Sequence, residues 1–284
     1  MGEGPLAIIA GGGTLPCALA DAAMAKGRAV HILGIRGEAE EKIERYPYTW
    51  LKWGEVGKLF ATLDDQGCRD LVIIGAVTRP DLANVRFDFG AIRNLPFLLS
   101  LGVGGDDHVL SSVVRFLEAK GYRVHGAGDV APELLAAEGP LGAKTPTQDD
   151  RDDIEMGFRV VSALGRLDVG QAAVVVKGHV LAVEAAEGTD AMLARCAELR
   201  KERGGRRRGP AGVLVKAPKP GQEERVDLPT IGPETVGRAA RAGLAGIAVS
   251  AGRVLIADRA AVMGAADKHG LFLFGQMLPH DQDA

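Results

Sequence analysis

The sequence is poor in cysteine and in aromatic residues, and neither sign of charge is in large excess. Its three cysteines, Cys17, Cys68 and Cys196, are far apart and lack paired CxxC spacing, which argues against a disulfide framework or a zinc site. The net charge is only −3, so the composition offers no electrostatic basis for binding nucleic acid. We therefore expect a protein of the reducing cytoplasm with no nucleic-acid partner.

Long apolar runs are also missing, and we expect no signal peptide. The nearest candidate for a membrane span, residues 95–103, is short and is interrupted by Pro96 and Gly102. A membrane-spanning helix needs about 20 apolar residues in succession. The chain is therefore expected not to span a membrane.

The length and the pattern of apolar runs indicate two α/β domains. A chain of 284 residues is long enough for about two domains, each with its own core and with a cleft between them. The segment from Ala131 to Gln148, APELLAAEGPLGAKTPTQ, is rich in proline and glycine, as interdomain linkers are. Strands alternate with helices on both sides of it. We predict a parallel-sheet domain over residues 1–134 and a second α/β domain, of mixed sheet, over residues 139–284.

A glycine-rich loop follows the first strand, which is expected at residues 6–10. The segment Gly11-Gly12-Gly13-Thr14 leads into a helix and then into a second strand at residues 29–33, which completes a βαβ unit. Such glycines either expose amides that bind an anion or merely make a tight turn. The spacing GGGTLP differs from the GxGxxG of NAD-binding enzymes, whereas Arg36 after the second strand leaves NADP open.

Two groups of aspartates stand at predicted helix starts. Asp106 and Asp107 follow a loop that opens at the ligand edge of the sheet, so they either cap a helix at 109–120 or belong to the site. Four more aspartates crowd residues 149–153, at the start of a helix predicted to end near residue 164. Carboxylates suit the positive end of the helix dipole, so we interpret these four as capping.

The loop after a buried strand at residues 212–216 combines charge with stiff backbone. Lys216, Lys219 and Asp227 lie there among several prolines and glycines. Cations that neutralise oxyanions and a carboxylate that holds a hard divalent cation are what phosphate chemistry requires. Glu187 and Asp190, three residues apart at a helix start, either form a capping pair or face one cation together.

A basic run, RKERGGRRRG, begins at Arg200. Such runs usually cover a solvated helix end and its loop, and the other interpretation is attraction to an anionic membrane surface.

Four blocks together resemble the LpxI-type UDP-2,3-diacylglucosamine pyrophosphatases of Gram-negative lipid A synthesis. They are GGGTLP at 11–16, GDD at 105–107, VEAAEGTDAMLARCAELR at 183–200 and GVLVKAPKPGQEERVDLPTIGPET at 212–235. The resemblance implies a Rossmann-like N-terminal domain and a C-terminal α/β domain that hold the substrate between them. It also implies magnesium-dependent hydrolysis to UMP and 2,3-diacylglucosamine 1-phosphate (lipid X). The family's catalytic-loop aspartate falls on Asp227, and its EGTD turn falls on residues 187–190.

On this basis we predict a Mg²⁺ ion held by Asp227 together with Glu187 or Asp190. Lys216 and Lys219 are expected to neutralise the charge that develops as water attacks a phosphorus atom. The predicted substrate-binding residues are Gly11, Gly12, Gly13, Thr14, Asp106, Asp107, Gln171, Thr189, Gly221, Gln222 and Thr230.

The expected partners are this substrate, its two products, the inner membrane surface in transient, peripheral contact, and a second copy of the chain in a homodimer. Two other functions stay open at this point. One is an NADP-dependent oxidoreductase that uses Arg36, and the other is a sensor that binds a nucleotide sugar without catalysis.

Overall fold

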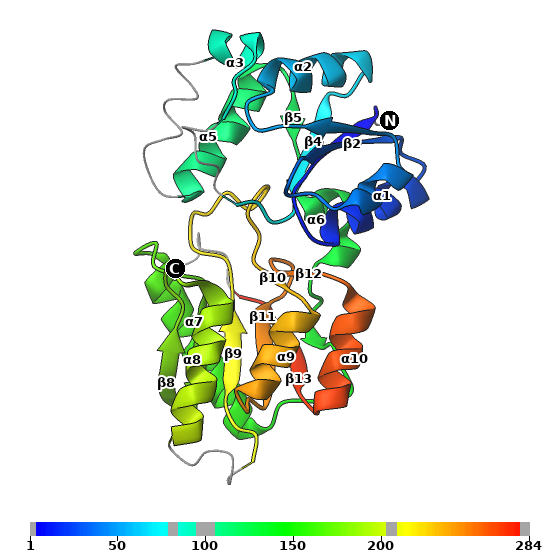
Figure 1. Ribbon diagram of the computed structural model, residues 1–284. Coiled ribbons are helices and arrows are strands. Elements are labelled where there is room, and N and C mark those ends of the chain that lie inside the picture. The colour runs from blue at the N-terminus through cyan, green and yellow to red at the C-terminus, as the bar shows by residue number, and fades with distance from the viewer. Residues whose placement is uncertain (1–3, 79–84, 95–105, 203–208, 279–284) are drawn as a thin grey trace. The chain divides into compact units, whose positions relative to one another are not determined.

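A computed structural model of the protein describes residues 4–78, 85–94, 106–202 and 209–278 (Figure 1). The chain divides into two compact units. Unit 1 comprises Met1–Pro132 and also Glu223–Asp227, while unit 2 comprises Glu133–Gln222 and Leu228–Ala284. The chain therefore returns to unit 1 for five residues, in the middle of the charged loop that the sequence assigned to the second domain.

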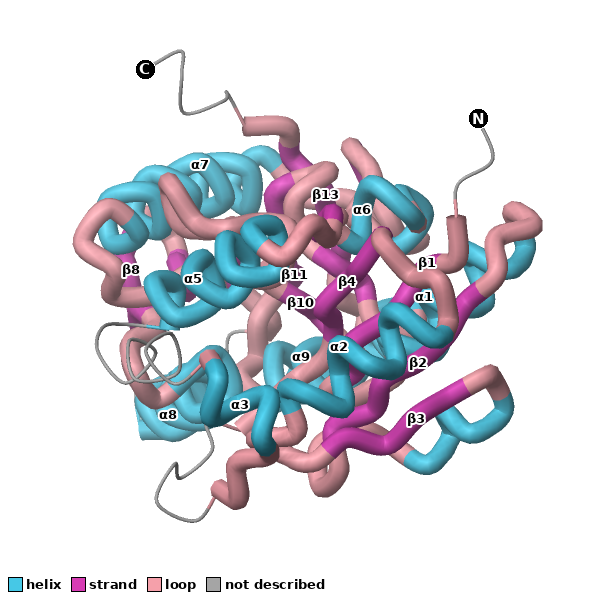
Figure 2. The backbone as a smooth tube through the Cα atoms, turned by 90° about the horizontal axis from the view of Figure 1, so that it is seen from above, coloured by secondary structure: helices cyan, strands magenta, loops and turns pink. Residues whose placement is uncertain are grey.

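Unit 1 is built on a five-stranded parallel sheet in the order β3-β2-β1-β4-β5, and the succession from β3 to β4 can be followed in Figure 2. The central strands are almost continuously apolar and buried, because helices cover a parallel sheet on both faces. The strands are β1 (Leu6–Ala10), β2 (Val30–Ile35), β3 (Tyr48–Leu51), β4 (Asp70–Ile74) and β5 (Arg123–Val124).

Helices α2 and α5 share one hydrophobic cluster with this sheet, through Leu63 and Leu117 against Leu33 and Leu71. Helix α1 contacts β1 and β2, and α6 contacts α1 and β4. The helical segments among the described residues of unit 1 are α1 (Leu15–Ala25), the 3-10 turn η1 (Glu41–Arg45), α2 (Val56–Asp65), α3 (Phe89–Arg93), α5 (Asp106–Ala119) and α6 (Ala127–Val130).

Unit 2 contains a six-stranded mixed sheet in the order β6-β13-β11-β9-β7-β8. Strands β9, β11 and β13 are parallel, whereas β7 is antiparallel to both β9 and β8, and β6 is antiparallel to β13. The two sheets confirm the predicted α/β class. The strands are β6 (Gly139–Pro140), β7 (Ala172–Val176), β8 (His179–Val183), β9 (Val213–Lys216), β11 (Gly246–Ser250) and β13 (Phe272–Gln276), and β10 (Thr230–Ile231) pairs separately with β12 (Leu255–Ile256).

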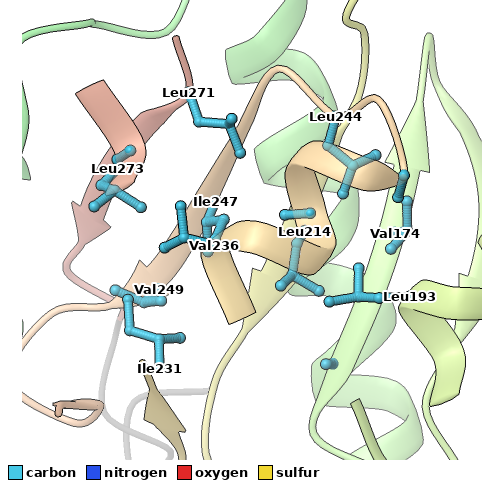
Figure 3. Packing of buried hydrophobic residues seen from close by; sticks show 14 of the residues in the cluster. Val174, Leu193, Leu214, Ile231, Val236, Leu244, Ile247, Val249, Leu271 and Leu273 are labelled. Carbon is cyan, nitrogen blue, oxygen red and sulfur yellow. The ribbon is translucent and has the colours of Figure 1, made fainter. Parts of the chain in front are cut away.

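Side chains alternate between the two faces of the unit 2 sheet. Val174, Leu214 and Ile247 face the cluster that includes residues of α8, α9 and α10 (Figure 3). Their neighbours along the strands, such as Val213 and Ala248, face α7 instead. This two-residue period is what buried strands between helical layers require. The remaining bounds are η3 (Pro132–Leu134), α7 (Gln148–Gly165), α8 (Gly188–Glu202), α9 (Pro233–Arg241) and α10 (Arg259–His269).

The aspartates at the start of α7 have two roles. Asp150 forms a capping box with Thr147, as predicted for this group. Asp153 is buried and instead accepts hydrogen bonds from the amides of Lys177 (2.9 Å) and Gly178 (2.6 Å) in the β7–β8 turn. The capping interpretation was therefore wrong for Asp153. Its hydrogen bonds stabilise a hairpin turn in which both residues have positive φ.

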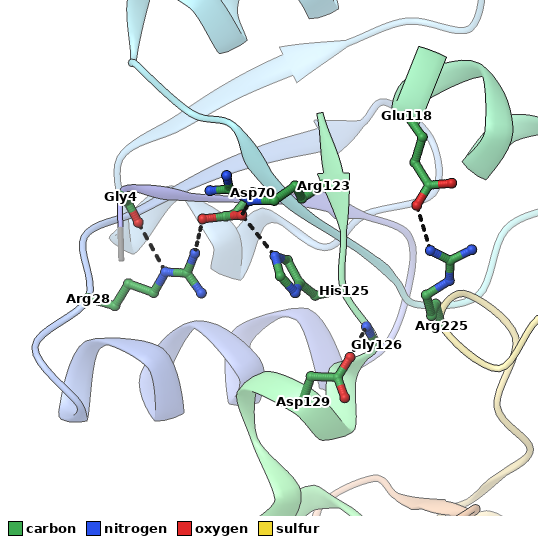
Figure 4. A network of polar contacts seen from close by, with 9 residues as sticks. All are labelled: Gly4, Arg28, Asp70, Glu118, Arg123, His125, Gly126, Asp129 and Arg225. Atoms are coloured by element: carbon green, nitrogen blue, oxygen red, sulfur yellow. Dashed lines mark hydrogen bonds and ion pairs between the residues drawn. The ribbon is translucent and has the colours of Figure 1, made fainter. Parts of the chain in front are cut away.

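A cluster of charged side chains surrounds the buried Asp70 carboxylate where β4 begins (Figure 4). The Asp70 carboxylate accepts from Arg123 Nε (2.6 Å), Arg28 Nη2 (2.7 Å) and His125 Nε2 (2.8 Å). The bond from Arg123, with smaller effects of His125 and Arg28, outweighs burial and lowers the pKa of Asp70 from 3.8 to about 2. The cluster lies at the amino end of its strand, away from the edge where ligands bind such sheets, so its role is structural.

None of the helices in the described part of the chain has the length and apolar composition needed to cross a bilayer.

Candidate functional site

The carboxyl edge of the unit 1 sheet contains a reversal of strand order. The chain runs from β1 to β2 on one side, and β4 pairs with the other side of β1. In open parallel sheets, ligands bind at such switch points, where the loops that follow neighbouring strands separate. The loops here are residues 11–14 after β1 and residues 75–78 after β4.

The two loops at this edge are joined by their backbones. The amides of Gly11 and Gly12 donate to the carbonyls of Ile74 (2.9 Å) and Ala76 (2.6 Å), and Ala76 donates back to Gly12. A Cβ on Gly11 would lie 2.4 Å from the Ala76 oxygen. These two glycines therefore permit the close approach of the loops, and their amides are used within the protein.

The next residues of the loop are open to solvent. Gly13 has φ +87° and, like Thr14, is exposed at the start of α1, an eleven-residue helix. An anion at this edge would thus meet the amides of Gly13 and Thr14, and not those of Gly11 and Gly12 as the sequence had also suggested. Asp106 and Asp107 begin α5, and their side chains lie outside what the structure describes.

The segment that carries Asp227 is anchored in unit 1. Arg225 donates to both carboxylate oxygens of Glu223 (2.7 and 2.8 Å) and to Glu118 on α5 (2.6 Å; Figure 4). Val226 packs against the hydrophobic cluster of the unit 1 sheet. The hydrogen bonds from Arg225 lower the pKa of Glu223. Asp227 is half-buried, and its amide donates to the Glu223 carbonyl at 3.1 Å, so this anchor sets the position of the aspartate.

We expect Arg225→Gln to reduce turnover while most of the stability remains, because the pairs of Arg225 are partly exposed and such pairs contribute little to folding. The expected fall in kcat is about 10- to 100-fold, the usual effect of removing a group that orients a functional side chain. Steady-state kinetics and melting temperature are measured together. Arg241→Gln, which breaks an exposed pair with Glu234, is the control. An unchanged kcat in Arg225→Gln would show that the anchor does not position Asp227.

The second group of predicted residues meets in unit 2, at the carboxyl end of β9. Lys216 is only 7% exposed, and its Nζ donates to Thr189 Oγ1 (3.1 Å) in the first turn of α8 and to the Thr230 carbonyl (3.2 Å). Thr189 Oγ1 in turn donates to Oε1 of Glu184 (3.0 Å), a buried residue directly after β8. The structure thus brings three predicted residues together and adds Glu184, which the sequence analysis missed.

Lys219 and the turn that follows it are held differently. Lys219 Nζ pairs with Asp168 at 2.5 Å, and its amide donates to the side chain of buried Gln222 at 2.8 Å. Gly221 has φ +77°, which the turn requires. Gln171 Oε1 is buried and has no hydrogen-bond partner among the described residues. The proline-rich loop is therefore fixed by local contacts, as its composition suggested.

The two remaining metal-ligand candidates are engaged by arginines. Glu187 pairs with Arg195 (3.0 Å) and Asp190 pairs with Arg238 (3.2 Å). In the described part of the chain, no group of three or more His, Cys, Asp or Glu side chains is arranged to hold a metal ion. Glu187 and Asp190 as they are placed do not fit a cation site. A Mg²⁺ ion bound through one carboxylate and substrate phosphates remains compatible with Asp227.

The basic run lies mostly outside the described residues, which resume at Gly209. Its first member, Arg200, donates to the carbonyls of Ala211 and Gly209, and burial lowers the pKa of its guanidinium. Arg200 therefore closes the end of α8 onto the chain before β9.

The parallel sheet with its glycine-rich switch point, followed by a mixed-sheet unit with a buried lysine at a strand end, defines a two-unit α/β protein of Rossmann-like type. The chain belongs to the LpxI family: the LpxI N-terminal domain matches residues 5–134 and the LpxI C-terminal domain matches residues 137–274. It is 47% identical over 270 residues to the UDP-2,3-diacylglucosamine pyrophosphatase LpxI of Caulobacter vibrioides. That alignment covers 95% of this chain and 96% of the relative.

Proposed function

We propose that the protein hydrolyses the pyrophosphate bond of UDP-2,3-diacylglucosamine, giving UMP and 2,3-diacylglucosamine 1-phosphate in lipid A biosynthesis. The observation that carries the proposal is 47% identity, along nearly the whole chain, to a relative named for this activity. The buried ammonium of Lys216 supports it, because a desolvated cation at a strand end is suited to neutralising a phosphate. An NADP-dependent oxidoreductase has no comparable support, and the Arg36 guanidinium lies over the Trp50 ring.

In the proposed reaction the residues have separate tasks. Lys216 neutralises charge on the phosphates, and Thr189 and the Thr230 carbonyl hold its ammonium in place. The amides of Gly13 and Thr14 receive the nucleotide end. Asp227 would hold Mg²⁺, and the metal when bound would polarise the pyrophosphate and offset its charge. Lys219 keeps a secondary electrostatic role, since Asp168 already pairs with it.

We propose that water attacks the phosphorus atom on the sugar side. Hydrolysis in ¹⁸O-labelled water with Mg²⁺ present tests this, because mass spectrometry of the products shows which one carries the label. The proposal predicts label in 2,3-diacylglucosamine 1-phosphate and none in UMP. Label in UMP would reject sugar-side attack, and the absence of both products would reject the function itself. Removal of Mg²⁺ with EDTA should stop product formation.

We also propose that the protein touches the inner membrane surface transiently and acts as a homodimer. The acyl chains of the substrate favour its residence in a membrane, so the enzyme has to reach the lipid surface to bind it. Exposed apolar side chains on α3, Phe89 (83% exposed) and Ile92 (56%), support such a contact. Complete recovery in the soluble fraction at both low and high salt would contradict it, and light scattering of the purified protein tests the dimer.

A further inference from the structure

Glu184 and Lys216 lie in one row across the unit 2 sheet. In the pairing of β7 with β9, Ala172 is opposite Lys216, and the Glu184 amide donates to the Ala172 carbonyl at 2.9 Å. Residues opposite one another on neighbouring strands project from the same face. Ala172 stands between them in the row and carries only a methyl group. The row brings together two charged residues that stand 32 positions apart in the sequence.

Thr189 links the two charges. Its hydroxyl accepts from the Lys216 ammonium (3.1 Å) and donates to Glu184 Oε1 (3.0 Å). Glu184 and Lys216 are each only 7% exposed. Buried charges are costly without a countercharge, and here a single hydroxyl connects carboxylate and ammonium. The Glu184 carboxylate therefore orients the Lys216 ammonium through the Thr189 hydroxyl.

The second oxygen of Glu184 is not satisfied in this way. Oε2 is buried and has no hydrogen-bond partner among the residues that the structure describes. An unmet buried acceptor is destabilising, and more so when it is charged, so it marks a place where an outside donor is expected. A group that binds there would lie beside the ammonium that we assign to the phosphates.

We propose that Glu184 is a further functional residue of this site, in two respects. Through Thr189 it positions the Lys216 ammonium. Its Oε2 accepts a hydrogen bond from a hydroxyl or N–H group on the part of the substrate that carries the phosphate neutralised by Lys216. The inference rests on the proposed function for the identity of that phosphate. Its donor group comes either from the nucleotide or from the sugar 1-phosphate, which share this chemistry.

The test uses Glu184→Gln, which keeps the size of the side chain, with the pair Thr189→Val and Thr189→Ser. Glu184→Gln and Thr189→Val should each lower kcat/KM by about 10- to 100-fold, the usual effect of removing a group that orients another. Thr189→Ser, which retains the hydroxyl, should recover most of the activity that Thr189→Val loses. The double variant Glu184→Gln/Thr189→Val should lose little more than Glu184→Gln alone, because both substitutions break the same chain of hydrogen bonds to Lys216.

Inhibition by UMP and by glucosamine 1-phosphate separates the two sources of the donor group. Glu184→Gln should weaken inhibition by whichever compound supplies that group and leave the other unchanged. Glu198→Gln, on the exposed side of α8, is the control for charge removal, and melting temperatures are recorded for every variant.

Three results would overturn the inference. They are wild-type kinetics in Glu184→Gln, equal losses in Thr189→Ser and Thr189→Val, and unchanged inhibition by both compounds. If Glu184→Gln does not fold, the serine and valine variants still decide the positioning role. A wild-type protein that does not turn over UDP-2,3-diacylglucosamine would instead count against the proposed function.

Discussion

Asp227→Ala should bind the substrate and fail to hydrolyse it. A carboxylate that holds a metal ion contributes most when charge develops in the transition state, so its loss falls on turnover more than on binding. The expected fall in kcat is on the order of 10² to 10⁴, the range for one positioned electrostatic group. The melting temperature should change little, because Arg225, Val226 and Pro229 fix the loop independently of the aspartate.

The measurement is turnover across a Mg²⁺ titration, with the melting temperature of the same preparations. Asp149→Ala, at an exposed carboxylate in the first turn of α7, serves as the matched control. Turnover near that of the wild type would reject the assignment of Asp227. A large drop in melting temperature would show that Asp227 acts in folding.

The second large effect is expected on stability. Asp70→Asn should lower the free energy of unfolding by about 3 kcal/mol, because breaking a buried ion pair leaves an uncompensated charge. The Arg28 side chain is only 8% exposed, so water cannot replace the carboxylate well. Urea unfolding measures the loss. Asp64→Asn breaks an exposed pair with Arg69 and should cost less than about 1 kcal/mol. Equal losses in the two variants would contradict the account.

The same cluster predicts an acid-sensitive contribution to stability. The pKa of Asp70 falls from 3.8 to about 2 in the folded protein, so the folded state holds the charged carboxylate more strongly than the unfolded state does. The contribution, about 2 kcal/mol, is complete above about pH 4 and is lost as the pH falls toward 2. Asp70→Asn should therefore lose less stability than the wild type over this window. The measurement is the free energy of unfolding of both proteins between about pH 4 and about pH 2. An equal fall in the two proteins would contradict this expectation.

Much of the fold could be predicted because its strands are buried. The apolar runs predicted as strands at residues 6–10, 29–33 and 212–216 are confirmed as β1, β2 and β9. Strand β3 and helix α2 were not predicted. Tyr48 in β3 is 40% exposed, so that strand lacks an apolar run. Helix α2 does carry Val56, Leu59, Phe60 and Leu63 at helical spacing, a signal that was present in the sequence and was not used.

The candidate site was less accessible to sequence reasoning. Local spacing suggested that Glu187 and Asp190 face one cation, but it could not show that Arg195 and Arg238 pair with them. Glu184 was not predicted as a site residue, and only the register across three strands reveals its row with Lys216. The attachment of the Asp227 segment to unit 1 depends on Glu118, 107 positions from Arg225. Long-range pairings of this kind leave no periodic signal.

The most direct test of the proposed function is to count turnovers. Purified protein is incubated with excess UDP-2,3-diacylglucosamine and Mg²⁺, and the UMP released is measured per molecule of protein. The account predicts many molecules of UMP per protein in the wild type, with a rate reduced on the order of 10² to 10⁴ in Asp227→Ala. Release of no more than one UMP per protein, with tight retention of uncleaved substrate, would contradict it and indicate a binding protein.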